Sequence, residues 1–278
     1  MSGKEMPGTL ADEDARALAS LMAFWSDAGV DASMADAPID RLAEGRKRLQ
    51  APVRPAPLPR AAAPAPIAMA PAGPDIAQAA ADARRLASEA PDLAALEAAI
   101  GAFEGCALHF AGAASKAVFA RGNPQAPIMV IGEGPGADED AQGAPFVGRA
   151  GKLLDKMLAA AGLEGRVFIT NTVFWRPPGN RTPTAEEQAA CLPFLERAIE
   201  LVHPKLLLLS GAASAKSMLK RKEGILAIHG KWFEWTSEDG ALTIPALPTL
   251  HPAFLLRQPQ AKKRAWGDLL TLVHKLEG

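Results

Sequence analysis

The sequence contains four residues whose types could do chemistry together: an acid, an aromatic ring, an amide and an imidazole. They are Glu133, within the glycine-rich stretch GEGPG (132–136), Phe146, Asn171 and His251. A carboxylate can orient water, a ring can stack on a planar ligand, an amide offers one acceptor and two donors, and an imidazole can donate to a developing oxyanion. Each also has an ordinary structural explanation: a solvated turn, a core residue, a turn cap and a structural histidine.

The glycine-rich stretch allows a sharp backbone turn and close approach to a ligand at Gly132, Gly134 and Gly136. It lacks the Gly-Lys-Ser/Thr ending of a P-loop and does not match GxGxxG. The acidic run 138–140 that follows would repel phosphate. Both features oppose a nucleotide-binding enzyme that uses this turn for phosphate, which is one alternative function.

Basic residues follow the same segments. Arg176 and Arg181 flank a proline-stiffened loop (RPPGNR), and Arg257 ends the segment HPAFLLR. Such residues suit contacts to backbone phosphates. The run 262–264 (KKR) either joins them or forms a solvated helix face. Because the formal net charge is only −1, any contact with nucleic acid must come from a local surface.

Short apolar runs must position these residues. The runs are 127–132 (PIMVIG), 167–171 (VFITN), 205–210 (KLLLLS) and 244–250 (IPALPTL), and helical patterns cover 151–161, 185–202, 212–220 and 262–276. Fully apolar runs that alternate with helices predict an α/β fold with a parallel sheet covered on both faces. Ligands bind beyond the carboxyl ends of such strands, so we expect the four side chains to gather there.

The chain divides into three parts. Residues 1–50 form a short helical N-terminal extension, with helical spacing at 10–28 and 39–49. Residues 51–76 form a Pro/Ala-rich linker that holds eight of the 24 prolines. Residues 77–278 form the domain that carries the four candidate residues, and it begins with an Ala-rich helical pattern over 75–102. The extension is interpreted either as a weakly ordered tether or as a docking element for a protein partner.

The composition limits the setting. Of 278 residues, 49% are hydrophobic and 22% charged, as in ordinary globular proteins. No apolar run is long enough for a membrane span, and the N-terminus lacks the basic and apolar regions of a signal peptide. Two cysteines are too few for a disulfide framework. These features predict a cytoplasmic protein without a membrane partner, and we expect a monomer.

Taken together and in this order, GEGPGADED, PFVGRAG, ITN, RPPGNRTP and HPAFLLR closely resemble the family 4 uracil-DNA glycosylases. The likeness extends from about Ala102 to the C-terminus. It implies a three-layer α/β/α sandwich with a central, mainly parallel sheet, and uracil-containing DNA as the partner. It also implies base excision repair: uracil is flipped out of DNA and its N-glycosidic bond is hydrolysed, which leaves an abasic site.

The resemblance also implies residue roles. Glu133 and His251 match the catalytic residues, Phe146 the ring that stacks on the base, and Asn171 the amide that reads its polar edge. Backbone amides of Gly132, Gly134 and Gly136 are expected to add uracil-binding donors, and Arg176, Arg181 and Arg257 to bind DNA. The HPAFLLR segment is similar to the loop that pushes into the duplex. Whether Glu133 orients water or stabilises the cationic sugar stays open.

The sequence departs from the family at its iron–sulfur site. The family characteristically carries a 4Fe–4S cluster on four cysteines, but Phe103 and Trp175 stand at two of these positions and only Cys106 and Cys191 remain. A cubane needs four ligands, usually thiolates, and the spacing of His109 does not match one. We therefore expect the cluster to be absent or defective, with the two aromatic rings filling its volume. The cluster does not perform base excision in this family, so no cofactor is required for the chemistry.

The main alternative is a non-catalytic protein that binds uracil or damaged DNA. The presence of both Glu133 and His251 argues against it. A variant that traps the abasic product through a histidine on an inserted basic loop is also disfavoured, because residues 136–146 contain neither a histidine nor an insertion.

Overall fold

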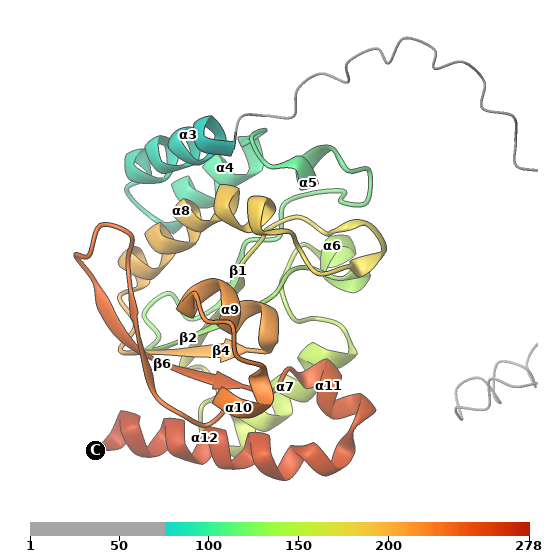
Figure 1. The fold of residues 1–278 in the computed structure, drawn as a ribbon, viewed down its shortest axis with the longest axis vertical. Helices are drawn as coiled ribbons and strands as arrows, with labels where there is room; N and C mark the ends of the chain where they lie inside the picture. The colour runs from blue at the N-terminus through green and yellow to red at the C-terminus, as the bar shows by residue number, and fades with distance from the viewer. Residues whose placement is uncertain (1–75) are drawn as a thin grey trace, which may run out of the picture. The chain divides into compact units, whose positions relative to one another are not determined.

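The computed structural model describes residues 76–278, so the predicted N-terminal extension and nearly all of the predicted linker lie outside the described residues. In this part of the chain, helices cover both faces of a six-stranded sheet (Figure 1). None of the helices described there has the length and apolar character needed to cross a bilayer.

The sheet has the strand order β1-β3-β2-β4-β6-β5. Its central strands β3, β2, β4 and β6 are parallel to one another, and the edge strands β1 and β5 are antiparallel to their neighbours. The bounds are β1 (Ala120–Gly122), β2 (Ile128–Gly132), β3 (Val167–Asn171), β4 (Leu206–Ser210), β5 (Phe233–Thr236) and β6 (Thr243–Thr249). The predicted α/β fold is therefore confirmed, since each apolar run forms one parallel strand.

The helices of the first half are α3 (Ile76–Glu89), α4 (Leu93–Ala102), α5 (Ala107–Phe110), α6 (Ala137–Gln142) and α7 (Arg149–Ala160). Those of the second half are α8 (Ala185–Val202), α9 (Ala212–Leu219), α10 (Ile225–Ile228), α11 (Pro252–Arg257) and α12 (Lys262–Glu277), with short 3-10 turns η1 (Pro178–Asn180) and η2 (Pro259–Ala261). The single helical pattern predicted over 75–102 is divided into α3 and α4. Pro91 interrupts it because proline has no N–H to donate, and Asp92 then caps α4 by accepting from the amide of Ala95 at 2.8 Å.

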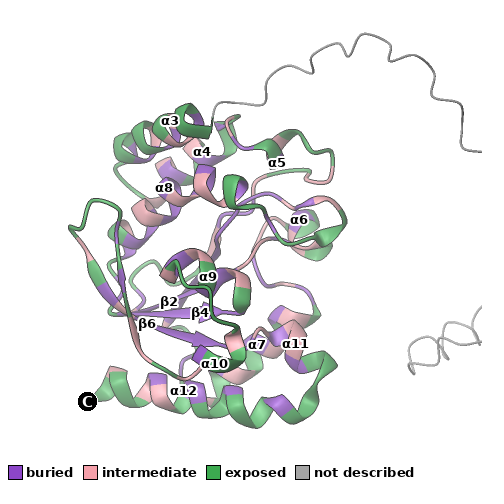
Figure 2. Ribbon diagram, viewed as in Figure 1, coloured by how far each residue is buried: buried purple, intermediate pink, exposed green. Residues whose placement is uncertain are grey.

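The buried strands alternate their side chains between two layers. In β2, Ile128 and Val130 belong to the core beneath α7 and α12. Met129 and Ile131 belong to the opposite core, beneath α3, α4 and α8. Figure 2 shows β2, β4 and β6 buried between these helical layers. Because side chains on a strand point alternately to opposite faces, a strand that is apolar throughout requires helices on both sides.

The chain leaves neighbouring strands in opposite directions. After β2 it continues to α7 on one face, and after β3 it continues to α8 on the other. Connections that diverge in this way open a crevice at the carboxyl ends of the two strands. Gly132 and Asn171, the last residues of β2 and β3, are partners in the strand register at this crevice.

One predicted loop is a helix. The segment 251–257, expected to be a loop, forms α11 over Pro252–Arg257. His251 is its N-cap and accepts from the amide of Ala253, while Pro252 occupies the first helical position. Proline is favoured there because its φ angle suits a helix and its missing N–H is not needed.

Candidate active site

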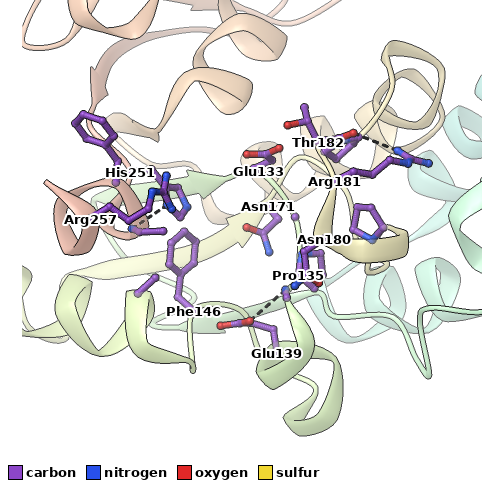
Figure 3. A pocket seen from close by; sticks show the side chains of 17 residues that line it. Glu133, Pro135, Glu139, Phe146, Asn171, Asn180, Arg181, Thr182, His251 and Arg257 are labelled. Atoms are coloured by element: carbon purple, nitrogen blue, oxygen red, sulfur yellow. Dashed lines mark hydrogen bonds between the residues drawn. The ribbon is translucent and has the colours of Figure 1, made fainter. Parts of the chain in front are cut away.

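Glu133, Phe146, Asn171 and His251 line one cavity of about 520 Å³ at the carboxyl edge of the sheet (Figure 3). They come from four separate segments: the turn after β2, the loop before α7, the end of β3 and the turn after β6. The structure thus brings together the four residues that the sequence singled out. Gly134, Gly136, Arg181 and Arg257 also line this cavity.

The side chain of Asn171 lies in the cavity in the space that the missing side chain of Gly132 leaves open. The Asn171 side chain is buried, and within residues 76–278 its amide makes no hydrogen bond. A Cβ atom at position 132 would overlap the Asn171 Oδ1 atom and lie 2.6 Å from the ring of Phe146. Glycine is therefore required for the amide and the ring to approach each other, and the amide keeps its acceptor and donors for a ligand.

Phe146 has an unusual backbone. Its φ angle is 56°, in the left-handed region, although it is not a glycine. Its ring is buried, with the centroid 5.7 Å from that of the His251 ring and a tilt of 30°. A residue in this region costs about 1–3 kcal/mol, so the surrounding contacts must hold the conformation. Figure 3 shows the ring beside both His251 and Asn171.

Glu139 connects the glycine-rich turn to the Phe146 loop. Its Oε1 atom accepts from the amides of Val147 at 3.0 Å and Gly148 at 2.9 Å, and its Oε2 atom accepts from the amide of Gly136 at 3.1 Å. The sequence prediction treated Glu139 only as part of an acidic run. A glutamate three residues after a helix N-cap is the signal that could have revealed it.

Two of the glycines that were expected to bind uracil have structural roles at the cavity. The amide of Gly136 is already donated to Glu139, so it does not present a free donor. Gly132 lies behind the Asn171 amide and the Phe146 ring, where its missing side chain makes room for them. Both glycines shape the cavity through their backbone, and Gly134 remains a lining residue.

His251 presents a defined face to the cavity. Its Nδ1 atom accepts from the amide of Ala253 at 3.1 Å, so in the neutral ring the proton must lie on Nε2. Burial lowers the pKa of His251 to about 4, and the positive charge of Arg257 adds to this, while the negative charge of Glu139 opposes it. The imidazole is therefore neutral at physiological pH, with Nε2–H as its donor.

Glu133 has a fixed backbone and a free carboxylate. Its carbonyl accepts from the Thr172 hydroxyl at 2.6 Å, and the carbonyl of Gly132 accepts from the Thr172 amide at 3.0 Å. The described part of the chain provides no hydrogen bond to the Glu133 carboxylate, which lines the cavity. It is therefore available to a bound water or to a ligand.

The arginines of the RPPGNR loop have partners within the protein. Arg181 donates to both carboxylate oxygens of Glu187, at 2.8 and 2.6 Å. Glu187 is buried, and the Arg181 guanidinium lowers its pKa. Arg176 donates to Asn180 Oδ1 at 2.7 Å and does not line the cavity, whereas Asn180, absent from the sequence prediction, does. Asn180 lies in the same RPPGNR loop, one residue after the arginine–proline motif, so its position could have suggested it.

The position of the expected cluster is an aromatic core. The Cys106 and Cys191 sulfur atoms lie 3.9 Å apart, and both side chains are fully buried. Phe103 packs 5.1 Å from Phe194 and 6.5 Å from Trp175 between ring centroids. The hydrogen bond from Cys191 lowers the pKa of Cys106, while burial raises that of Cys191.

The residues at this core do not fit a four-ligand cluster. Two thiols provide half of the ligands of a cubane, and the other two family positions are filled by Phe103 and Trp175. Across residues 76–278, no three His, Cys, Asp or Glu side chains are grouped in a way that could hold a metal ion.

Comparison with known proteins adds a family and several relatives. The family model of the uracil DNA glycosylase superfamily matches residues 119–270. The chain is 41% identical to the Type-4 uracil-DNA glycosylase of Sulfurisphaera tokodaii over 155 residues, which are 54% of this chain and 70% of that protein. It is 40% identical to the enzyme of that name from Thermotoga maritima over 154 residues (55% and 77%), and 38% identical to the one from Pyrobaculum aerophilum over 169 residues (59% and 84%).

Proposed function

Because this chain belongs to the uracil-DNA glycosylase superfamily, we propose that it excises uracil from DNA by hydrolysing the N-glycosidic bond. The product is an abasic site, as in the first step of base excision repair. The observation that carries the proposal is that an acid, a ring, an amide and an imidazole line one cavity. A protein that only binds the base has no need of Glu133 and His251, so the catalytic function is favoured.

Base recognition depends on Phe146 and Asn171. The cavity lies at the carboxyl edge of the sheet, so the target nucleotide must leave the DNA stack to enter it. Phe146 then stacks on the pyrimidine ring, while the Asn171 amide donates to O4 and accepts from N3–H. Cytosine presents a donor at position 4 and an acceptor at N3, which is the opposite pattern. Purines are excluded by their size.

Leaving-group stabilisation depends on His251. As the bond between C1′ and N1 breaks, its electron pair leaves with the uracil, and negative charge accumulates on O2 and O4. The neutral His251 ring has its Nε2–H free because Nδ1 is committed to the Ala253 amide. We assign this N–H to O2 of the departing base. Loss of such a preorganised donor typically costs about 3 kcal/mol of barrier.

The sugar is left with oxocarbenium character, and a water molecule attacks C1′. Glu133 is the carboxylate with no protein hydrogen bond in this cavity among residues 76–278. It either orients that water and accepts its proton, or stabilises the positive charge on the sugar. Glu139 is not suited to these roles because its oxygens already accept three backbone amides.

DNA binding is assigned to the rim of the cavity. Arg257 and Arg181 line it, and α11 carries the partly exposed Leu256 next to Arg257. We propose that α11 pushes into the duplex while the arginines contact phosphates, with Arg176 contributing from the neighbouring loop. Arg181 keeps 43% of its side chain exposed despite its pairing with Glu187, so it remains accessible to a phosphate.

We further propose that this enzyme works without an iron–sulfur cluster. The support is the aromatic packing of Phe103 and Trp175 around two buried thiols. Iron analysis of the purified protein tests this point: we expect no iron above background and no brown colour. About four iron atoms per chain would overturn it. The cytoplasmic location, the monomeric state and the protein partner of residues 1–50 stay predictions.

The decisive experiment measures uracil excision from a single-stranded oligonucleotide under single-turnover conditions. The proteins to compare are wild type, Asn171→Ala, His251→Ala and the control His274→Ala, which changes an exposed histidine of α12. We expect abasic sites from wild type and the control, and rates lowered about 100-fold in the two cavity variants. Retention of uracil DNA by wild type without strand cleavage after alkali would instead indicate a binding protein.

A further inference from the structure

Two charged side chains form hydrogen bonds with the backbone on both sides of Phe146. Arg121 of β1 donates from Nε to the carbonyl of Pro145 at 2.7 Å, in the peptide group before Phe146, and from Nη2 to the carbonyl of Phe146 at 3.1 Å, in the peptide group after it. On the C-terminal side, Glu139 accepts from the amides of Val147 and Gly148. Four hydrogen bonds from two side chains therefore fix the peptide groups around one residue.

We infer that Arg121 and Glu139 are positioning residues for base recognition, and that they act by holding the Phe146 ring in place. We call this pair the Phe146 clamp. The inference rests on the proposed function, since it concerns how the cavity stacks on a flipped base. It assigns a role to two residues that belong neither to the predicted catalytic set nor to the predicted DNA-binding set.

The backbone conformation of Phe146 needs support from its surroundings. The φ angle of 56° at Phe146 is unfavourable for a residue with a side chain. The buried ring has no polar group to anchor it, so its position follows from the backbone. The hydrogen bonds of the clamp offset the cost of this φ angle. If they are removed, we expect the Phe146 backbone to relax to an ordinary φ angle, which would turn the ring away from Asn171.

The clamp also connects the Phe146 loop to the rest of the site. Glu139 also accepts from the amide of Gly136, which ends the turn that carries Glu133. Arg121 also pairs with Asp155 of α7 at 2.7 Å. These contacts fix the position of the Phe146 loop relative to the turn that carries Glu133 and relative to α7.

The charge of Glu139 also favours a positioning role. The carboxylate of Glu139 lines the cavity, where an uncompensated negative charge would oppose the negative charge that grows on the leaving uracil. Its three backbone N–H partners stabilise the carboxylate in place. This arrangement suits a residue that organises the cavity better than one that reacts in it.

The test is a double-mutant cycle in the full-length protein, with single-turnover excision rates and inhibition by free uracil as the measurements. Glu139→Ala and Arg121→Lys are each combined with Phe146→Ala. If the clamp acts through the ring, each clamp variant alone should slow excision about tenfold and weaken inhibition by uracil, within the coupling range of neighbouring residues. In the Phe146→Ala background, the same changes should alter the rate by no more than about twofold.

A matched control separates positioning from stability. Asp92 also caps a helix through its carboxylate, but on α4, outside the residues that line the cavity. Asp92→Ala should lower the melting temperature and leave excision unchanged. If Glu139→Ala does not fold, Glu139→Gln takes its place in the cycle, and Arg121→Lys is kept as the second clamp variant. If wild type is active and each clamp variant slows excision by the same factor with and without Phe146→Ala, the inference is wrong. If wild type itself does not excise uracil, the proposed function is wrong.

Discussion

Gly132 and Asn171 end adjacent parallel strands as register partners, and the space that a side chain at Gly132 would occupy is taken by the Asn171 amide. The same space borders the ring of Phe146, at 2.6 Å from the position of a Cβ atom. The two groups that would contact a base therefore meet over a residue without a side chain. This relationship makes position 132 unusually sensitive to substitution.

The change Gly132→Ala should slow excision strongly while the protein remains folded. The added methyl group must displace either the amide or the ring, and overpacking of this kind costs about 1–3 kcal/mol. Excision rates and melting temperatures of the variant test this. Gly101→Ala in α4 is the control, because a Cβ atom there has nothing within 4 Å. Wild-type rates from Gly132→Ala would contradict the close approach of the Asn171 amide and the Phe146 ring at this position.

The pH dependence should show no titration of His251 near neutrality. Since its pKa is lowered to about 4, the neutral donor persists as the pH falls through 6.5, the value of an unperturbed histidine. The unfolded chain binds that proton first, so this group lowers stability as the pH falls from 6.5 towards 4. Proton NMR of the His251 ring would follow it directly. A midpoint near 6.5 would contradict the prediction.

Replacement of Trp175 by alanine should destabilise the protein by about 3–5 kcal/mol, as for other large aromatic side chains in cores. Trp175 is 2% exposed and packs against Phe174, Phe103 and His109. Denaturant unfolding measures the effect, and Trp266→Ala, at a residue 37% exposed on α12, is the matched control. Well below its melting temperature, the Trp175 variant should still excise uracil. If both variants lose the same free energy of unfolding, the packing of Trp175 in the aromatic core does not contribute more to stability than an exposed tryptophan does.

Acid should weaken the attachment of the RPPGNR loop to α8. Arg181 holds the pKa of Glu187 below its usual 4.5, with help from the amide of Thr184. The interaction therefore stabilises the protein above pH 4.5 and is lost as the pH falls through the lower, folded-state value. Melting temperatures of wild type and Glu187→Gln should differ near neutrality and converge in acid. A constant difference at all pH values would exclude this explanation.

The parallel strands, and the cavity residues at their carboxyl ends, were predictable for one physical reason, whereas Phe146 lies in a loop away from the strand ends and was identified through the family resemblance. A strand buried on both faces must be apolar throughout, and function gathers at its carboxyl end, so Asn171 and His251 stand out as polar residues directly after apolar runs. The edge strands β1 (ARG) and β5 (FEWT) left no such signal. Their outer sides face solvent, which permits charged residues within the strand.

The clamp could not be predicted in this way. Glu139 lies in an acidic run that suits a solvated surface, and only the folded chain brings the amides of Val147 and Gly148 to it. Arg121 lies on an edge strand without apolar periodicity. The helix α11 was missed for a related reason, because six residues are too few to display a helical period. Its cap and its proline were the only local signals.

The strand order has a consequence for how activity is gained during folding. The cavity collects residues from β2, β3 and β6, and β4 must stand between β2 and β6 before His251 can approach Phe146. These are pairings between segments far apart along the chain, which form slowly because long loops must close first. In a refolding experiment, excision activity should therefore return only when the whole sheet has assembled. Collapsed intermediates in which β4 does not yet separate β2 from β6 should therefore be inactive towards uracil-containing DNA.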